Sequence, residues 1–347
     1  MQNPAIAVAL SGGVDSLVSG FLLKEKYPHV FGLHFTTGYE NQPGNMAYIK
    51  DQLKMDIMNL DLSKAFEKEV VHYFVSTYTR GQTPNPCMVC NQKIKFGVLL
   101  EQAKKLGADY LATGHYATIV NPLTRPHRNV SHAWLEKGAD TVKDQSYFLA
   151  RLSSRQLSRI LCPLADYTKN QVKDLAARYN LAPLRKKESQ DICFIHGTDF
   201  GKFISDKTGM VFEKGPVIDM TGRQVGTHDG VFRFTIGQRR GINCPAAAPY
   251  YVRKIDPVTN TLHVCFKQDL AQTQMAVDSI MWNDPDGENR QNLKTKIRYH
   301  HKEAASRLYR RGSAGRVVFK HPQYAVTPGQ AAVFYNGKRV SGSGIIQ

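Results

Sequence analysis

Residues 5–19, AIAVALSGGVDSLVS, decide the fold. The apolar run 5–10 has the length of a parallel strand that is buried on both faces, and residues 11–13 break that run with two glycines. Glycines allow positive φ and a close approach to a ligand, and the N–H groups at the start of the following helix point toward a bound anion. The stretch predicts a strand, a phosphate-binding turn and a helix, although a glycine turn of this kind can also bind nothing.

The spacing of the turn separates it from other phosphate-binding loops. A Walker A loop needs Lys and then Ser or Thr after its second glycine, and a dinucleotide-binding turn needs G-x-G-x-x-G; this turn has neither. Residues 11–16, SGGVDS, instead resemble the signature of PP-loop ATP pyrophosphatases. The resemblance implies ATP with Mg²⁺ on Asp15, and the ATP phosphates on the turn. The residues implied are Ala9, Leu10, Ser11, Gly12, Gly13, Val14, Asp15 and Ser16.

The composition favours a large protein with a phosphate-rich partner. The chain has 347 residues, which predicts two or three domains, and 46 Lys and Arg against 29 acids give a net charge of +17. A protein that is simply basic is the plain alternative. Six cysteines are too few for a disulfide scaffold, and neither a signal segment nor an apolar run of about 20 residues stands out. We therefore expect a cytoplasmic protein with reduced thiols and no membrane contact.

The pattern of apolar residues predicts three parts. Strands and amphipathic helices alternate to about residue 115, which indicates a Rossmann-like α/β domain with a parallel sheet and ligands at the carboxyl edge of its strands. We read 121–143 as an excursion from that sheet. Short β-type runs follow after about residue 208, and 283–288, NDPDGE, resembles a linker. The predicted domains are 1–205, a central β-rich domain 206–275, and a C-terminal β-barrel domain 276–347.

Residues 81–96, GQTPNPCMVCNQKIKF, hold the next candidates for chemistry. Two prolines predict a stiff loop before Cys87, with Cys90 at the start of the following helix. The helix dipole and nearby lysines would favour the Cys90 thiolate, which makes it a plausible nucleophile. Half of a zinc site is the alternative, but no second ligand pair stands at finger spacing. Cys193 follows a basic run and is either a second reactive thiol or a packing residue.

Six motifs in register carry a more specific resemblance. They are SGGVDS, TPNPCMVCNQKIKF, ATGHYA at 112–117, KDQSYFL at 143–149, SQDICFI at 189–195 and FTIGQRRG at 234–241. Their order and spacing resemble those of the tRNA-specific 2-thiouridylases along nearly the whole chain. The resemblance implies that ATP adenylates the C2 oxygen of the wobble uridine, U34, and that sulfur from a cysteine persulfide then displaces AMP.

The resemblance also implies roles for individual residues. Cys193 would carry the persulfide, and Cys90 would break it and leave a transient disulfide with Cys193, consistent with a reducing compartment. A protein that donates or relays the persulfide sulfur is an implied partner, together with the anticodon region of the tRNA. Further ATP contacts are implied at Phe35 and Gly114. Implied tRNA contacts are Asn85, Pro86, Cys87, His115, Lys143, Asp144, Gln145, Arg298, Tyr299 and Gln330.

One position departs from the family. Many members carry an aspartate where this chain has Cys87, so the chain holds three cysteines that could meet at one point. Three thiolates can hold a [4Fe–4S] cluster and leave one iron open to bind sulfide. We prefer the persulfide route. Two other functions stay open: a PP-loop synthetase acting on a small molecule, and an RNA-binding module without catalysis.

Overall fold

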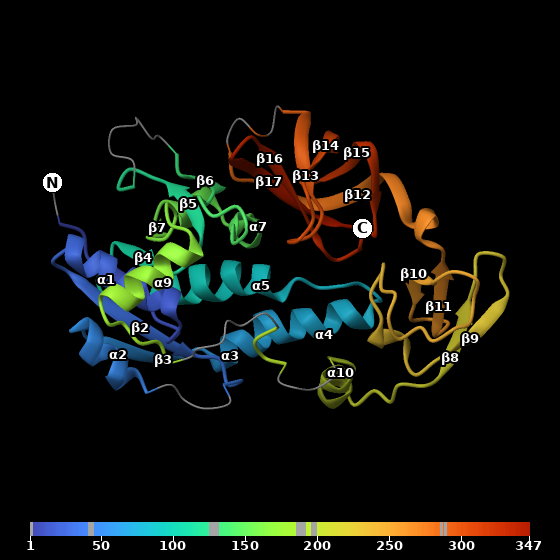
Figure 1. Cartoon of the computed structure of the whole chain (residues 1–347), viewed down its shortest axis with the longest axis horizontal. Helices are drawn as coiled ribbons and strands as arrows, with labels where there is room; N and C mark the ends of the chain where they lie inside the picture. The colour runs from blue at the N-terminus through green and yellow to red at the C-terminus, as the bar shows by residue number, and fades with distance from the viewer. Residues whose placement is uncertain are drawn as a thin grey trace.

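The computed structural model describes residues 3–40, 45–124, 132–184, 192–195, 200–284, 287 and 290–347. Figure 1 shows a parallel sheet with its helices near the N-terminus, a small sheet at the opposite end, and a β-barrel that contains the C-terminus. The predicted α/β class, with a central β-rich part and a C-terminal barrel, is confirmed. No helix in the described part of the chain is long and apolar enough to span a membrane.

The parallel sheet has the strand order β3-β2-β1-β4-β7. Apolar strand residues fill both sides of it, as expected for strands covered by helices on each face. Its strands are β1 Ile6–Ala9, β2 Val30–Thr36, β3 Ile57–Asp61, β4 Tyr110–Ala112 and β7 Ile160–Leu161. Its helices include α1 Val14–Lys26, α2 Met46–Leu53, α9 Lys169–Arg178 and the continuous set α3 Ser63–Phe66, η1 Glu67–Val71 and α4 His72–Thr79.

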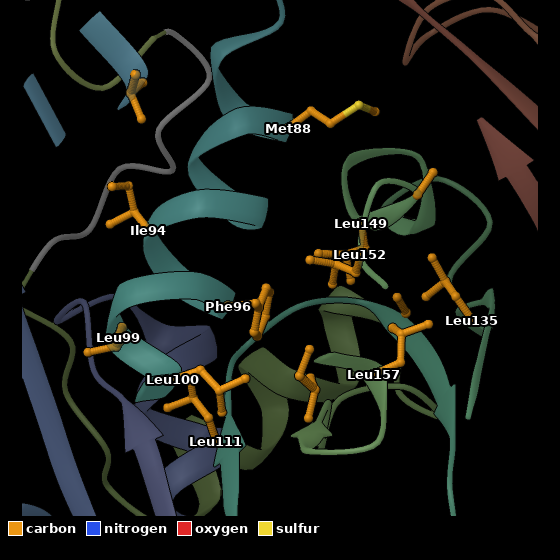
Figure 2. Close-up of a cluster of buried hydrophobic side chains, with 14 of the residues drawn as sticks. Met88, Ile94, Phe96, Leu99, Leu100, Leu111, Leu135, Leu149, Leu152 and Leu157 are labelled. Carbon is orange, nitrogen blue, oxygen red and sulfur yellow. The ribbon is translucent and has the colours of Figure 1, made fainter. Parts of the chain in front are cut away.

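A second continuous helix crosses the core. It consists of α5 Pro86–Val89, η2 Cys90–Leu99 and α6 Leu100–Lys105, and η2 has the wider π-type turn. Figure 2 shows Met88 and Phe96 on the side of this helix toward Leu149, Leu152 and Leu157, whereas Ile94 and Leu99 lie on its opposite side. The side-chain amide of Gln156 donates to the carbonyl oxygens of Gln92 at 3.0 Å and Phe96 at 2.7 Å. These bonds satisfy carbonyl groups within the π-type segment, which is a form of helix found mostly at functional sites.

The region predicted as an excursion contains a hairpin. Strands β5 Ala117–Val120 and β6 Trp134–Lys137 pair antiparallel, and β6 then pairs with the last strand of the barrel. Residues 125–131 of this region lie outside the described part. After the short helices α7 Ser146–Leu149 and α8 Ser154–Leu157, strand β7 joins the parallel sheet beside β4.

The middle of the chain forms a separate four-stranded sheet with the order β10-β11-β8-β9. A helix, α10 Phe200–Thr208, leads into it, and the predicted boundary at residue 205 falls within that helix. The strands are β8 Gly215–Ile218, β9 Gln224–His228, β10 Tyr251–Asp256 and β11 Thr261–Cys265. Two short 3-10 helices, η3 Val231–Arg233 and η4 Lys267–Leu270, complete this part.

Six antiparallel strands close the C-terminal barrel, because β12 pairs with both β15 and β17. They are β12 Ala271–Trp282, β13 Asn292–Lys296, β14 Ala304–Arg311, β15 Ala314–Tyr324, β16 Ala331–Asn336 and β17 Arg339–Ile346. The predicted linker 283–288 follows β12, so it lies within the barrel and not between domains. Asn283 and Asp284 are fully buried, and Asp284 pairs with Arg290 at 3.2 Å and Arg339 at 3.3 Å.

The barrel and the parallel-sheet domain share one hydrophobic core. Val333, Tyr335 and Val340 of the barrel belong to the same buried cluster as Tyr147 and the α5–α6 helix. The Tyr147 hydroxyl donates to the Ala331 carbonyl oxygen at 3.0 Å across this contact. The barrel is therefore fixed against the domain that holds the predicted chemistry.

Candidate active site

The turn between β1 and α1 exposes backbone N–H groups. Gly12 has φ of +79°, and the N-cap residue Gly13 has no side chain to occupy the donors of the first helical turn. The Ser16 hydroxyl donates to the Gly13 carbonyl at 2.9 Å and accepts from the Ser11 N–H at 3.2 Å. Because the first N–H groups of a helix lack partners within the helix, this turn has the geometry of an anion site.

Asp15 faces two side chains that the sequence did not link to it. The Lys169 ammonium donates to both carboxylate oxygens of Asp15 at 2.8 Å, and the Tyr116 hydroxyl donates to one of them at 2.6 Å. The Lys169 side chain is only 9% exposed. A buried ammonium needs such a partner, so these three residues form one charge-compensated unit beside the turn.

The sequence did not single out Lys169, because the residues beside it cap a helix and that role explains the segment. Thr168 and Gln171 form a capping box at the start of α9, and Lys169 is the first residue of that helix. A lysine in the first turn is unfavourable with the positive end of the helix dipole. That local conflict was the available signal of a partner elsewhere in the fold.

The end of β4 packs against the start of α1. A Cβ atom on Gly114 would lie 2.8 Å from the Asp15 carbonyl carbon and 2.9 Å from the Ser16 nitrogen, so only glycine fits here. His115 is buried, and its Nδ1 lies 2.8 Å from the Thr113 hydroxyl. Burial lowers the pKa of His115 well below its ordinary value, so the ring is neutral and is not displayed at the surface.

The other predicted nucleotide residues line the same edge of the sheet. Ala9 ends β1, Val14 begins α1, and the half-buried Phe35 lies near the end of β2. The buried Leu10 presents its carbonyl to His34 Nδ1 at 2.8 Å. These positions agree with a ligand site at the carboxyl ends of the strands.

The Cys87 loop is held at its start by a helix cap. The Asn85 side chain accepts from the Met88 N–H at 3.2 Å, and the buried Pro86 is the first residue of α5. The Gln330 side chain of the barrel donates to the carbonyl oxygens of Thr83 at 3.1 Å and of Pro84 at 2.9 Å. The loop and the exposed Cys87 are thus positioned from both the helix and the barrel.

Three cysteines converge near one lysine. Desolvation is the main cause that raises the pKa of Cys90 and Cys193; the charge of ionised Cys193 and then Cys87 adds to it at Cys90, and that of Cys87 adds to it at Cys193. The positive charge of Lys95 acts on all three thiols and on His115. The negative charge of Glu40, which lies just beyond the end of β2, also raises the pKa of Cys193. The thiols therefore lie beside the carboxyl edge of the sheet.

The predicted activation of Cys90 by the helix dipole is wrong for this structure. The helix begins at Pro86, one turn earlier than expected, and burial raises the pKa of Cys90 to about 12 in spite of Lys95. The Cys87 and Cys193 side chains are exposed, yet the protein atoms around their thiols exclude enough water to raise the pKa of both. All three are neutral thiols near pH 7.

A standing disulfide bond is not supported, because all six cysteines are free. Cys162 and Cys265 are buried among apolar residues. Within the ranges that the structure describes, no three His, Cys, Asp or Glu side chains are grouped as ligands of a metal ion. The three thiols converge without forming a ready cluster site, and Asp15 offers one carboxylate, as many Mg²⁺ sites beside phosphates do.

Comparison with known proteins identifies the family. A tRNA methyl transferase HUP domain matches residues 4–197, a tRNA methyl transferase PRC-barrel domain 202–266, and an aminomethyltransferase beta-barrel domain 272–346. The tRNA-specific 2-thiouridylase MnmA of Desulfosudis oleivorans is 47% identical over 100% of this chain and 96% of its own length. The chain belongs to the tRNA-specific 2-thiouridylase family. The predicted family and enzyme class are confirmed.

Other relatives agree. MnmA of Moorella thermoacetica is 38% identical, covering 98% of both chains, and MnmA of Desulforudis audaxviator is 40% identical with the same coverage. Among solved structures, the U34-tRNA thiolase NcsA of Methanococcus maripaludis aligns with 60% of this chain and 65% of its own at 19% identity and a TM-score of 0.35, which is too loose to bear on the fold.

Most of the predicted tRNA residues already contact other parts of the protein. Asp144 is buried and accepts from the Gly138 and Ser146 N–H groups at 3.1 Å. The Gln145 side chain accepts from the Tyr116 N–H at 3.0 Å. The half-buried Lys143 precedes them, and in the barrel the exposed Arg298 precedes Tyr299.

Tyr299 packs against Phe148 with ring centroids 4.5 Å apart. Several of the residues predicted to contact tRNA thus also hold parts of the protein in position, as Gln330 does for the Cys87 loop.

The raised pKa of Cys90 predicts slow alkylation. We expect iodoacetamide at pH 8 to modify native Cys90 roughly a thousandfold more slowly than the same cysteine in the denatured chain. Since the pKa lies at about 12, the rate should rise about tenfold for each pH unit while the fold persists. Mass spectrometry of labelled peptides measures both, with the buried Cys162 as an equally slow control. A rate that levels off between pH 8 and 9 would contradict the burial argument.

Proposed function

We propose that the protein transfers sulfur to C2 of the wobble uridine, U34, of tRNA, in two steps. ATP first adenylates the C2 oxygen and releases pyrophosphate; a persulfide sulfur then displaces AMP. The observation that carries this proposal is the convergence of Cys87, Cys90 and Cys193 on Lys95, whose charge also reaches His115 beside the nucleotide turn. Adenylation of the uridine and delivery of the sulfur would thus take place at the same site.

The sulfur step balances with two cysteines. Cys193 carries the persulfide, and its outer sulfur forms the bond to C2 as the bond to AMP breaks. The Cys90 thiolate attacks the inner sulfur of Cys193, the persulfide bond breaks, and its electron pair goes to the outgoing sulfur. A Cys90–Cys193 disulfide remains, and a cellular dithiol, or two monothiols, supplies the two electrons that reduce it. A persulfide donor protein and a reducing cytoplasm complete the proposal.

Both thiols need activation when substrate arrives, because desolvation holds them neutral. Lys95 is the cation whose charge lowers the pKa of both and so stabilises either thiolate. The target uridine has to leave its stack in the anticodon loop to reach the loop of Asn85, Pro86 and Cys87. Cys87 is exposed, and the base would approach the thiols beside it.

The nucleotide turn would hold ATP through backbone N–H groups and the hydroxyls of Ser11 and Ser16. Asp15 is the residue that would hold Mg²⁺, which neutralises phosphate charge when bound. Lys169 compensates Asp15 at 2.8 Å and thereby prevents an exposed carboxylate from repelling the phosphates. Lys169 is therefore part of the proposed ATP site.

Replacing Lys169 tests this role. We expect Lys169→Met to weaken ATP binding at least tenfold, because the Asp15 carboxylate then faces the phosphates without its cation; Lys169→Arg should retain part of the affinity. Calorimetric titration with ATP and Mg²⁺ measures the effect. Arg178→Met, at the exposed end of the same helix, is the matched control. Unchanged ATP affinity in a folded Lys169→Met protein would remove Lys169 from the site.

The activity itself is tested by thiolation of tRNA. ATP, Mg²⁺, a persulfide donor and unmodified tRNA should yield 2-thiouridine, AMP and pyrophosphate, as measured by mass spectrometry of the nucleosides. Cys90→Ser and Cys193→Ser should each abolish the product, whereas Cys244→Ser, in the central domain, should not. Retained turnover in Cys90→Ser would show that another group breaks the persulfide. Pyrophosphate release that is indifferent to tRNA would indicate a small-molecule synthetase, and tRNA binding without pyrophosphate exchange an RNA-binding module.

The replacement of aspartate by Cys87 allows a second route for sulfur, through a [4Fe–4S] cluster on Cys87, Cys90 and Cys193. Cys87→Asp separates the two routes. The persulfide route needs only Cys90 and Cys193, so we expect this variant to keep at least a third of the wild-type rate. A cluster would lose one of three ligands, and both activity and iron would fall. Iron and acid-labile sulfide analysis after anaerobic purification checks the outcome, and four irons per chain in the wild type would overturn our preference.

A further inference from the structure

The C-terminal barrel carries an unusually basic segment. Residues 290–324 contain ten Lys and Arg but a single acid, Glu303, a surplus of nine out of the chain's net +17. The single acid forms an ion pair with Lys137 at 2.5 Å. About a tenth of the chain therefore carries half of its net charge, and no acid lies in β13, β14 or β15.

Because side chains alternate along a strand, most basic residues of these strands lie on the outer face of the barrel. Leu293, Leu308, Val317 and Phe319 face the barrel core, so the residues between them face outward. The outward residues gather across three neighbouring strands, and we name this surface the basic face. It consists of Lys294 and Lys296 on β13, Arg307 and Tyr309 on β14, and Arg316 and Lys320 on β15.

The basic face includes a shaped hollow and a stacked aromatic ring. A hollow of about 540 Å³ is lined by Lys294, Arg307, Tyr309 and Lys320, among others. The guanidinium groups of Arg307 and Arg316 lie 5.2 Å and 5.5 Å from the centre of the Tyr309 ring, which is 43% exposed. The ring holds two cations side by side, and guanidinium groups match phosphate oxygens in geometry.

The basic face runs into the predicted tRNA contacts. Lys296 lies over the rings of Tyr147, at 5.9 Å, and of Tyr299, at 5.4 Å, and Tyr299 packs on Phe148 beside the Lys143 segment. Neighbouring strands are about 4.8 Å apart, so β14 and β15 extend this surface by about 10 Å. That distance corresponds to several base pairs of RNA duplex.

We propose that the basic face of the barrel binds the phosphate backbone of the tRNA stem that adjoins the loop held at the active site. This inference rests on the proposed function, which makes tRNA the substrate. Its chemistry is sequence-independent: charge neutralisation and counterion release supply affinity and orientation, and the base at the active site supplies selectivity. Arg307 and Arg316 are the central contacts, with Tyr309 holding them in place.

The double variant Arg307→Gln/Arg316→Gln tests the proposal. We expect Kd for unmodified tRNA to rise about tenfold and the salt dependence of log K to fall by about 2, while the thiolation rate at saturating tRNA stays unchanged. Tyr309→Phe keeps the ring and should bind tRNA like the wild type. Lys104→Gln/Lys105→Gln, at the exposed end of α6 that leads to the opposite edge of the sheet, removes the same charge and should change the salt slope far less.

The outcomes separate the surface from the activity. Unchanged Kd and salt slope in the double variant would overturn the basic face, even if the wild type thiolates tRNA. A wild type that binds tRNA with the predicted slope but makes no 2-thiouridine would refute the activity and keep the surface. A variant that keeps its tRNA affinity, and slows only when a protein supplies the sulfur in place of sulfide, would assign the face to the donor protein and so overturn the proposal.

Discussion

No side chain fits between the end of β4 and the start of α1. A Cβ atom at Gly114 would collide with the backbone of Asp15 and Ser16, so the two elements meet backbone to backbone. This contact brings Tyr116 within reach of Asp15, and buries His115 behind the turn. The nucleotide turn, its charge compensation by Lys169 and the approach to the cysteines all depend on that one close approach.

Burial and charge act in opposition at the cysteines. Desolvation by the surrounding protein favours the neutral thiol at Cys87, Cys90 and Cys193, Lys95 favours the thiolate, and desolvation prevails at all three. A neutral thiol is a poor nucleophile and a poor metal ligand, so the neutral form slows oxidation of the site. The reactivity of the thiols then depends on how the arriving substrate changes the solvent and the charges around them.

The sequence predicted the features that short stretches encode. The strand, turn and helix of residues 5–19 and the capping box of Thr168 and Gln171 follow from adjacent residues. Lys169 was missed because its partner lies 154 positions away. The predicted direction of the pKa shift of Cys90 was wrong, because the start of the helix at Pro86 and the depth of burial both depend on how the whole chain packs. Six motifs in the same order and spacing identified the family. The chemistry of each motif alone would not have distinguished this family from other PP-loop proteins.

The shared core has a consequence for how the chain is made. The cluster that surrounds the α5–α6 helix includes Val333 and Tyr335 of β16 and Val340 of β17, and β17 also pairs with the hairpin of the first domain. These strands follow the first domain by more than 100 residues in the chain and leave the ribosome after it. The first domain therefore completes its interior only after the barrel strands have been made, and a chain truncated before β16 would expose apolar surface at the very place where sulfur chemistry is proposed.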